Sequence, residues 1–172
     1  ISSKTKGILI NSPSNPTGGV WRDSSVLEVL NIAKSINAWV FSDECYEQLT
    51  YDRPYISTAT LMNDYNRILT FQSCSKTYAM TGWRIGWIIV PENHIRQIES
   101  IVQNMFICAP HVSQVVAIAA MDAKDELESN MSVYRENRSL MIEGLAKAGF
   151  TEIAPPDGAF YIYANISKFS SD

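Results

Sequence analysis

The sequence predicts an α/β fold: a mostly parallel sheet with helices on both faces. Composition supports this prediction, because 172 residues that are 46% hydrophobic and 19% charged can build a sizeable core. The candidate strands are continuous apolar runs without polar alternation, which is typical of strands buried on both faces. Helical or long connecting segments separate these runs, as parallel pairing requires.

Apolar runs predict the strands of this sheet. The first run, Gly7 to Pro13, stops in the turn "SNPTGG", whose Pro and Gly residues favour a chain reversal. Further runs have the same buried character: Ala38 to Glu44, Arg67 to Ser73, and Arg84 to Val90.

Polar residues follow three of these strands where the chain leaves the sheet. Asn15 follows the first strand, Asp43 the second, and Ser73 with Lys76 the third. Ligands of parallel α/β sheets bind at the carboxyl ends of the strands. We therefore expect these side chains to gather at one edge of the sheet.

Helical periodicity is visible in the remaining segments. Asp23 or Ser24 can cap a helix that continues to about Ile36. After Pro91, residues 93–106 and 111–123 predict two helices separated by Ala109-Pro110, and 122–148 predicts a long amphipathic helix closed by Gly149. The last apolar run, residues 159–166, predicts a strand.

Charge and composition exclude several classes of protein. A formal net charge of −4 without a basic stripe argues against nucleic acid as a partner. No apolar run reaches the ~18 residues that cross a bilayer, so no membrane segment is expected. The three cysteines form no CxxC pair, and His94 and His111 lie on separate predicted helices, so we expect reduced cytosolic thiols and no metal site.

Lys76 is the first candidate for chemistry. The stretch "SCSKTYAMTGWRIGW", from Ser73 to Trp87, holds Lys76 and Arg84 but no acidic residue. A desolvated lysine has a lowered pKa and can form a Schiff base with an aldehyde, although a lone lysine is more often a surface residue. A guanidinium beside the Ser73 hydroxyl suits a phosphate monoester, the alternative being an arginine with its head in solvent.

Other polar residues suit an aromatic ligand. Asp43 ends a buried strand and could pair with a protonated ring nitrogen, or it could simply cap a turn. Tyr46 could reach a phenolic oxygen on that ring, or merely pack. Asn15 could bond the same oxygen, or only support its own turn. Taken together with Lys76, these groups describe pyridoxal 5'-phosphate.

These motifs resemble those of the class I and II aminotransferases, a family of fold-type I pyridoxal-phosphate-dependent enzymes similar to aspartate and aromatic aminotransferases. The resemblance rests on "NPTG" at Asn15 to Gly18, "DECYE" at Asp43 to Glu47, and the stretch from Ser73 to Trp87. It covers the middle and later part of a family member, so we expect this chain to begin inside a larger protein.

The resemblance also implies roles for the candidate residues. It makes Lys76 and Asp43 catalytic, with Lys76 carrying the cofactor as a Schiff base and Asp43 protonating its ring nitrogen. The cofactor-binding set that it implies is Asn15, Asp43, Tyr46, Ser73, Lys76 and Arg84. It implies a partial large domain over residues 1–122, an interdomain helix over 123–149, and the start of a small C-terminal domain over 150–172.

The implied function is transfer of an amino group between an amino acid and a 2-oxo acid, in a cytoplasmic homodimer. Other reactions are open on the same scaffold, such as a pyridoxal-phosphate-dependent C–S lyase or an amino-acid cyclising synthase. A catalytically inert fragment is a further alternative, because parts that the family needs are missing from this chain.

Overall fold

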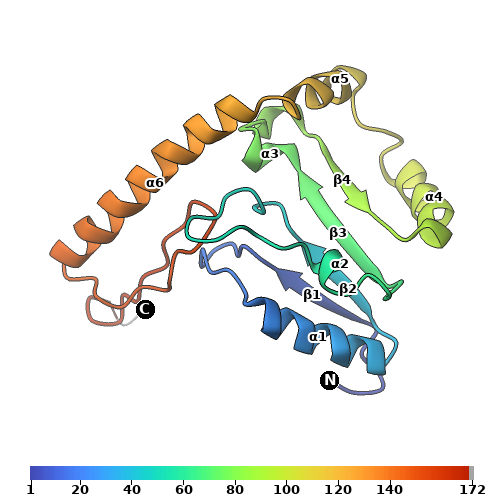
Figure 1. Ribbon diagram of the computed structural model, residues 1–172, viewed down its shortest axis with the longest axis horizontal. Coiled ribbons are helices and arrows are strands. Elements are labelled where there is room, and N and C mark those ends of the chain that lie inside the picture. The colour runs from blue at the N-terminus through green and yellow to red at the C-terminus, as the bar shows by residue number, and fades with distance from the viewer. Residues whose placement is uncertain (171–172) are drawn as a thin grey trace.

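A computed structural model describes residues 1–170, so the last two residues of the predicted segment 150–172 lie outside the described part. Its core is a four-stranded sheet in the order β1-β2-β3-β4 (Figure 1). The strands are β1 (Gly7–Asn11), β2 (Trp39–Asp43), β3 (Ile68–Ser73) and β4 (Gly86–Ile89). β1, β2 and β3 pair in parallel, whereas β4 pairs antiparallel to β3. The predicted α/β fold with a mostly parallel sheet is confirmed.

The four longer helices form where the periodicity predicts them, and two short helices, α2 and α3, were not predicted. They are α1 (Asp23–Ser35), α2 (Thr58–Leu61), α3 (Cys74–Thr77), α4 (Ile95–Met105), α5 (His111–Ala120) and α6 (Lys124–Lys147), with 3₁₀ turns at Thr81–Trp83 and Glu92–His94. Among residues 1–170, no helix is both long enough and apolar enough to span a membrane.

The ends of two helices test the cap predictions. α1 begins after Arg22, and no side chain caps it, so the prediction of a cap at Asp23 or Ser24 is wrong. Asp23 is instead the first helical residue, where its negative charge still favours the helix N-terminus. α6 ends as predicted, because Gly149 adopts φ +95° just after the helix, a conformation that glycine adopts without steric cost.

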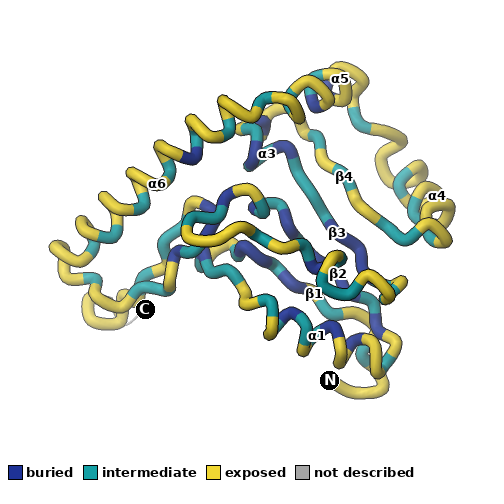
Figure 2. The backbone as a smooth tube through the Cα atoms, viewed as in Figure 1, coloured by how far each residue is buried: buried dark blue, intermediate teal, exposed yellow. Residues whose placement is uncertain are grey.

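The core lies between α1 and one face of the sheet. Val26, Leu30 and Ala33 of α1 are buried there and form one apolar cluster with strand residues. Figure 2 shows this burial along α1 and the first three strands. The opposite face is largely open within residues 1–170: Leu9 is 71% exposed, although His94 packs edge-on against Trp39. In the described part, helices α1 and α2 therefore cover one face only.

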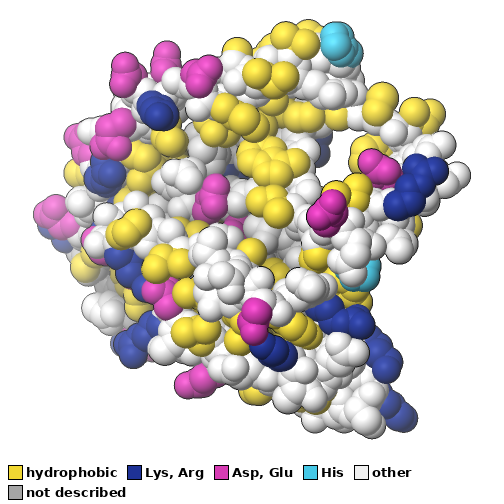
Figure 3. Space-filling view, turned by 45° about the vertical axis from the view of Figure 1, so that its right-hand side comes forward, with side chains coloured by type: hydrophobic (Ala, Val, Ile, Leu, Met, Phe, Trp, Pro, Cys, Tyr) yellow, Lys and Arg dark blue, Asp and Glu magenta, His cyan; other side chains and the backbone are white. Residues whose placement is uncertain are grey.

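β4 is not the buried strand that its sequence predicts. Ile88 and Ile89 are exposed, because within residues 1–170 β4 is an edge strand that pairs only with β3. Figure 3 shows hydrophobic side chains over the part of the surface that includes β4, α4 and α5. Within α5, Val112 and Val115 are exposed, whereas Val116 packs against the cluster around Cys74.

The chain after α6 returns to the carboxyl ends of the strands (Figure 1). The strand predicted over 159–166 does not form: residues 153 and 164 make an isolated bridge, and so do Thr50 and Gly158. A strand needs a neighbouring strand with which its backbone forms a ladder of hydrogen bonds. Here the backbone finds separate partners instead, such as Leu49, whose carbonyl accepts from the Ala159 N–H at 2.7 Å.

Candidate active site

Asp43 ends β2 beside Asn11, the last residue of β1, because the parallel register pairs these two positions. The Asn11 side-chain amide donates to Asp43 Oδ2 at 3.0 Å, and the backbone N–H of Cys45 donates to Oδ1 at 3.2 Å. Each carboxylate oxygen thus has a donor within the protein. These bonds fix the orientation of the carboxylate at the edge of the sheet.

Asn15 connects to the same edge through its backbone. Its N–H donates to Asn11 Oδ1 at 2.8 Å, so Asn11 bridges Asn15 and Asp43. The residue is exposed, and its side chain contacts neither Asp43 nor Tyr46 in the described part of the chain. The role that the sequence suggests for its amide stays a prediction.

Lys76 lies in α3, directly after β3. Ser73 precedes this helix, and its Oγ accepts from the Ser75 N–H at 3.1 Å, which turns the chain from strand into helix. Lys76 Nζ then lies 5.7 Å from the ring centroid of Tyr46 and 5.7 Å from that of Phe160. Over residues 1–170, no carboxylate lies within ion-pair distance of this amine. Aromatic rings are its neighbours.

The pKa of Cys45 reports the local charges. Burial raises it to about 12, and the hydrogen bond and charge of Asp43 add to the rise, while the charge of Lys76 opposes it. Asp43 ends β2, and Lys76 follows β3, which runs parallel to β2. The two opposite charges therefore share this edge of the sheet.

Arg84 stands just before β4, which begins at Gly86 and not at Arg84 as predicted. Its backbone is left-handed, with φ 51° and ψ 51°, which is uncommon for a residue with a Cβ. The exposed guanidinium donates to the Thr81 carbonyl at 3.0 Å, and no contact joins it to the Ser73 side chain within residues 1–170. The pairing of β3 with β4, with Ser73 opposite Gly86, nevertheless brings the backbone of Arg84 close to Ser73.

Gly86 permits that close approach. A Cβ at this position would lie 2.5 Å from the backbone oxygen of Gln72, a separation that side chains do not tolerate. Only glycine lets β4 meet β3 here without displacing either backbone. The Arg-Ile-Gly sequence therefore places the cationic Arg84 two residues before Gly86, which lets this part of the chain approach β3.

The segment from 156 to 161 closes the site from the side of α6. The Tyr161 hydroxyl lies 2.6 Å from the Tyr46 hydroxyl, and the Phe160 ring meets the Tyr46 ring edge-on at 5.5 Å. Gly18 supports this segment: its carbonyl accepts from the Gly158 N–H at 2.8 Å, and at φ +73° it leaves room for the Tyr161 backbone oxygen. The "NPTG" turn and the later segment therefore pack as one unit.

Sequence reasoning missed Asn11, Phe160 and Tyr161. Asn11 carried a usable signal, because it is the only side-chain amide in the apolar run of the first strand. Phe160 and Tyr161 carried none, since they lie more than 100 positions from Tyr46 in the sequence and only folding brings them near; the separation for Tyr161 is 115.

A buried acidic residue was also not predicted from the sequence. Glu44 is fully buried, and its Oε1 accepts from the Ser42 hydroxyl at 2.8 Å and from the Thr58 N–H at 2.9 Å. These bonds tie the turn after β2 to the start of α2. Asp43 and Tyr46 flank Glu44 in that turn, so the buried acid holds the backbone that carries them.

Comparison with known proteins decides the family. Residues 1–170 match the model of the family described as aminotransferase class I and II. This chain belongs to that family. Its aminotransferase relatives include the valine–pyruvate aminotransferase of Mycobacterium tuberculosis, 36% identical over 100% of this chain and 45% of that protein. Another is the aspartate aminotransferase of Sulfolobus acidocaldarius, 32% identical over 98% of this chain and 42% of that protein.

Solved aminotransferase structures agree with the fold. An aminotransferase from Mycobacterium tuberculosis, 36% identical, superposes with a TM-score of 0.90 over 97% of this chain and 43% of that chain. The aspartate aminotransferase from Thermus thermophilus with maleate, 29% identical, gives 0.91 over 100% and 45%. The chain thus spans less than half the length of the aminotransferases that it matches.

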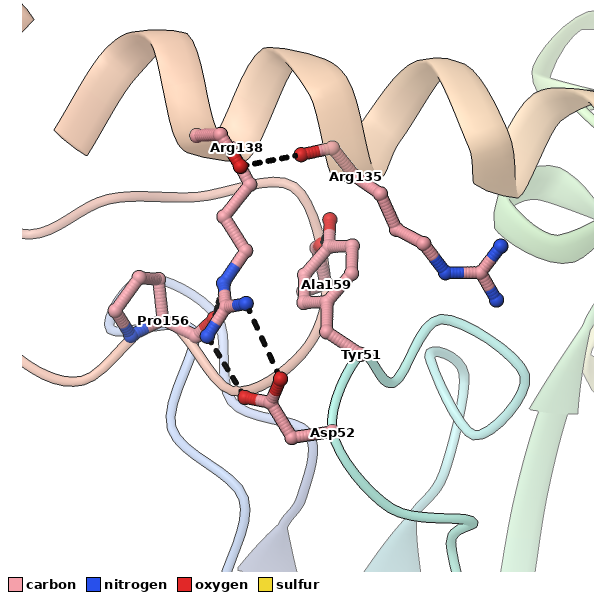
Figure 4. Close-up of polar contacts among 7 residues, drawn as sticks. Tyr51, Asp52, Arg135, Arg138, Pro156 and Ala159 are labelled. Carbon is pink, nitrogen blue, oxygen red and sulfur yellow. Dashed lines mark hydrogen bonds and ion pairs between the residues drawn. The ribbon is translucent and has the colours of Figure 1, made fainter. Parts of the chain in front are cut away.

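Polar contacts join α6 to the loop after β2 and to the segment before Tyr161 (Figure 4). Arg138 in α6 donates from Nε to the Pro156 carbonyl at 2.8 Å and lies over the Tyr51 ring at 5.0 Å. Asp52 pairs with the same guanidinium, and the Tyr51 hydroxyl donates to the Ala159 carbonyl. The helix, the loop after β2 and the segment that carries Tyr161 are therefore joined.

The class I and II aminotransferases use pyridoxal phosphate, and the residues present fit that group. An unpaired amine, Lys76, suits its aldehyde, and the oriented carboxylate of Asp43 suits its ring nitrogen. Arg84 has no acidic partner within residues 1–170, so its charge is available for a phosphate. Burial, followed by the hydrogen bond to Tyr161, raises the pKa of Tyr46, which keeps this phenol protonated and able to donate.

Proposed function

We propose that the whole protein is a pyridoxal-phosphate-dependent aminotransferase that moves an amino group between an amino acid and a 2-oxo acid. The observation that carries the proposal is the position of Lys76: it follows β3 at the same edge of the sheet as Asp43, and its amine lies 5.7 Å from the Tyr46 ring centroid with no carboxylate partner in the described part. Membership of the class I and II aminotransferases supports the reaction class.

Each candidate residue has a task in this proposal. Ser73 and Arg84 would hold the phosphate, and Lys76 would bond the cofactor through its ε-amine. Asp43 would pair with the ring nitrogen, and Asn15 and Tyr46 would bond the ring oxygen. When bound, pyridoxal phosphate supplies an aldehyde and a ring that accepts electrons.

The residues of the chain do the proton work. Lys76, once its amine is free, would take the proton from the α-carbon of the substrate as a general base and would pass it to the C4' carbon of bound pyridoxal phosphate as a general acid. Asp43 keeps the ring nitrogen protonated through the orientation that Asn11 and the Cys45 N–H impose. The hydroxyls of Ser73 and Tyr46 position the cofactor and do not move this proton.

The first experiment separates the reaction classes. The whole protein is incubated with pyridoxal phosphate, 2-oxoglutarate and one amino acid at a time. Formation of glutamate together with the matching 2-oxo acid supports the aminotransferase. Release of pyruvate and ammonia without a new amino acid would instead support a C–S lyase, and a ring-closed product a cyclising synthase.

The second experiment tests Lys76 directly. Borohydride should fix pyridoxal phosphate covalently to the wild-type protein, and peptide mapping should find the label on Lys76. Lys76→Ala should take no label, whereas Lys34→Ala, a change of an exposed lysine on α1, should be labelled like wild type. Label on another lysine would contradict the proposal, and no label in any variant would support the inert alternative.

Assembly, location and domain boundaries belong to the same proposal. We infer a homodimer in the cytoplasm, with the large domain over residues 1–122, the interdomain helix over 123–149 and the small domain from residue 150. Exposed apolar residues on α4 and α5 support association of this part of the surface with further protein. Sedimentation of the whole protein tests the dimer.

A further inference from the structure

The hydroxyls of Tyr46 and Tyr161 meet at 2.6 Å, a short contact between residues 115 positions apart in the sequence. Tyr46 is 4% exposed, and Tyr161 is half-buried. The rings also pack edge-on, with centroids 5.7 Å apart. This contact is the only hydrogen bond of either hydroxyl within residues 1–170.

The segment that carries Tyr161 is held firmly. The Ala159 N–H donates to the Leu49 carbonyl at 2.7 Å, and the Gly158 N–H donates to the Gly18 carbonyl at 2.8 Å. On the other side, the Tyr51 hydroxyl donates to the Ala159 carbonyl. Because these bonds surround position 159, the hydroxyl of Tyr161 has a fixed place from which to hold Tyr46.

A phenol offers one proton and two acceptor positions. Bonded to one neighbour, the Tyr46 oxygen can still serve a second partner. If Tyr161 donates to Tyr46, the single proton of Tyr46 remains available for an acceptor in the site. The proposed acceptor is the phenolic oxygen of pyridoxal phosphate, which a donated hydrogen bond stabilises in its ionised form.

We propose that Tyr161 is a positioning residue that acts through Tyr46: in the cofactor-bound protein it donates to the Tyr46 oxygen and leaves the Tyr46 proton for the ring oxygen of the cofactor. This inference rests on the proposed function. It assigns a task to the segment after α6, which neither the motifs nor the cofactor contacts of Tyr46 by themselves explain.

The first test uses the cofactor-free whole protein, so that it does not depend on the proposed function. Tyrosine labelled with carbon-13 at Cζ is observed by NMR at neutral pH, with Tyr46→Phe used to assign the Tyr46 signal. The Tyr46 Cζ carries the hydroxyl that lies 2.6 Å from the Tyr161 hydroxyl. In Tyr161→Phe the Tyr46 signal should therefore shift, because the Tyr46 oxygen loses its hydrogen-bond partner. A Tyr46 signal at its wild-type position would overturn the inference.

Tyr163→Phe is the matched control for this measurement. Tyr163 lies two positions further on, is exposed, and makes no hydrogen bond through its hydroxyl in the described part of the chain. The change is chemically the same, so the Tyr46 signal should stay at its wild-type position. Tyr161→Phe keeps the ring contacts with Tyr46 and Phe160, and it therefore preserves the fold.

The second test uses the protein with bound pyridoxal phosphate and follows the pH at which the cofactor absorbance changes. Tyr161→Phe should raise that pH by about half a unit, and Tyr46→Phe should raise it further. If Tyr161 acts through Tyr46, the double variant should match Tyr46→Phe alone. Additive shifts, or no shift in Tyr161→Phe, would overturn the inference.

The two tests separate failure of the inference from failure of the proposed function. If Lys76→Ala keeps the cofactor absorbance of wild type, the proposed function fails and the inference about the cofactor fails with it, whatever the NMR signal of Tyr46 shows. If Lys76→Ala loses that absorbance, while the absorbance of the double variant changes at a higher pH than that of Tyr46→Phe, only the role of Tyr161 fails.

Discussion

The guanidinium of Arg138 in α6 forms a bidentate ion pair with the carboxylate of Asp52, with Nη2 2.8 Å from Oδ2 and Nη1 3.4 Å from Oδ1. The partners are unequal, since the Arg138 side chain is 24% exposed and that of Asp52 is 65% exposed. Arg138 also donates to the carbonyl of Pro156, a buried residue. The arginine therefore does more than pair a surface charge: it joins α6 to the segment that leads to Tyr161.

This inequality predicts unequal effects of mutation. Asp52→Ala removes an exposed charge and should cost less than about 1 kcal/mol in the free energy of unfolding. Arg138→Ala also leaves the Pro156 carbonyl without its donor and should cost about 2 kcal/mol. Urea denaturation measures both values. Equal losses would show that the ion pair alone carries the contact.

Gly86 predicts a second change in stability. Gly86→Ala places a Cβ against the Gln72 backbone oxygen, so β3 and β4 must separate, and we expect a loss of about 2 to 4 kcal/mol. Gly82→Ala is the control, because nothing lies within 4 Å of a Cβ there. Thermal unfolding of both variants checks this, and the prediction fails if Gly82→Ala is as damaging as Gly86→Ala.

Asn11 predicts an effect on cofactor binding. Asn11→Ala removes the donor to Asp43 Oδ2 and should weaken retention of pyridoxal phosphate about tenfold. Asn11→Asp should weaken it more, because it faces one carboxylate with another. Absorbance titration with the cofactor measures the dissociation constant. Asn31→Ala, on the exposed side of α1, should bind the cofactor like wild type. If Asn11→Asp also bound it with the wild-type dissociation constant, the role of the contact between Asn11 and Asp43 would be refuted.

Cys45 predicts a dependence on pH. Its pKa rises from 9.0 to about 12 in the folded chain, which therefore holds the thiol proton more tightly than the unfolded chain does. The resulting contribution to stability is complete below about pH 9 and is lost as the pH rises toward 12. Cys45→Ser should flatten this fall in the free energy of unfolding, relative to wild type.

The same pKa predicts the order in which the thiols react. At neutral pH, iodoacetamide should modify the exposed Cys108 first and leave Cys45 unmodified, because the thiolate is the reactive form. Peptide mass spectrometry follows each site. Modification of Cys45 as fast as Cys108 at neutral pH would contradict the raised pKa.

The sequence predicted the positions of most strands and of the longer helices. Continuous apolar runs predicted β1, β2 and β3, and helical spacing predicted α1 and α6 to within a few residues. The Gly149 end of α6 followed from the left-handed conformation that glycine accepts. The sequence also predicted that Asp43 and Lys76 lie at one edge of the sheet, because parallel strands end on the same side.

The two failed strand predictions have one physical cause. The runs 84–90 and 159–166 are apolar enough to be buried strands, but burial and strand pairing depend on which neighbours the chain brings to them. Among the residues that the structure describes, β4 has a partner on one side only, and the segment 159–166 bonds to loops instead of to a strand. Composition alone does not reveal whether such neighbours exist.

By itself the sequence determined the local elements, the family motifs and the chemical types of the candidate residues, because these depend on spacing along the chain. Tertiary structure alone decided that Tyr161 meets Tyr46 across 115 positions and that Arg138 meets Asp52 across 86. Such contacts arise because α6 and the chain after it pass close to the carboxyl ends of the strands. Packing between these segments sets the geometry of the contacts.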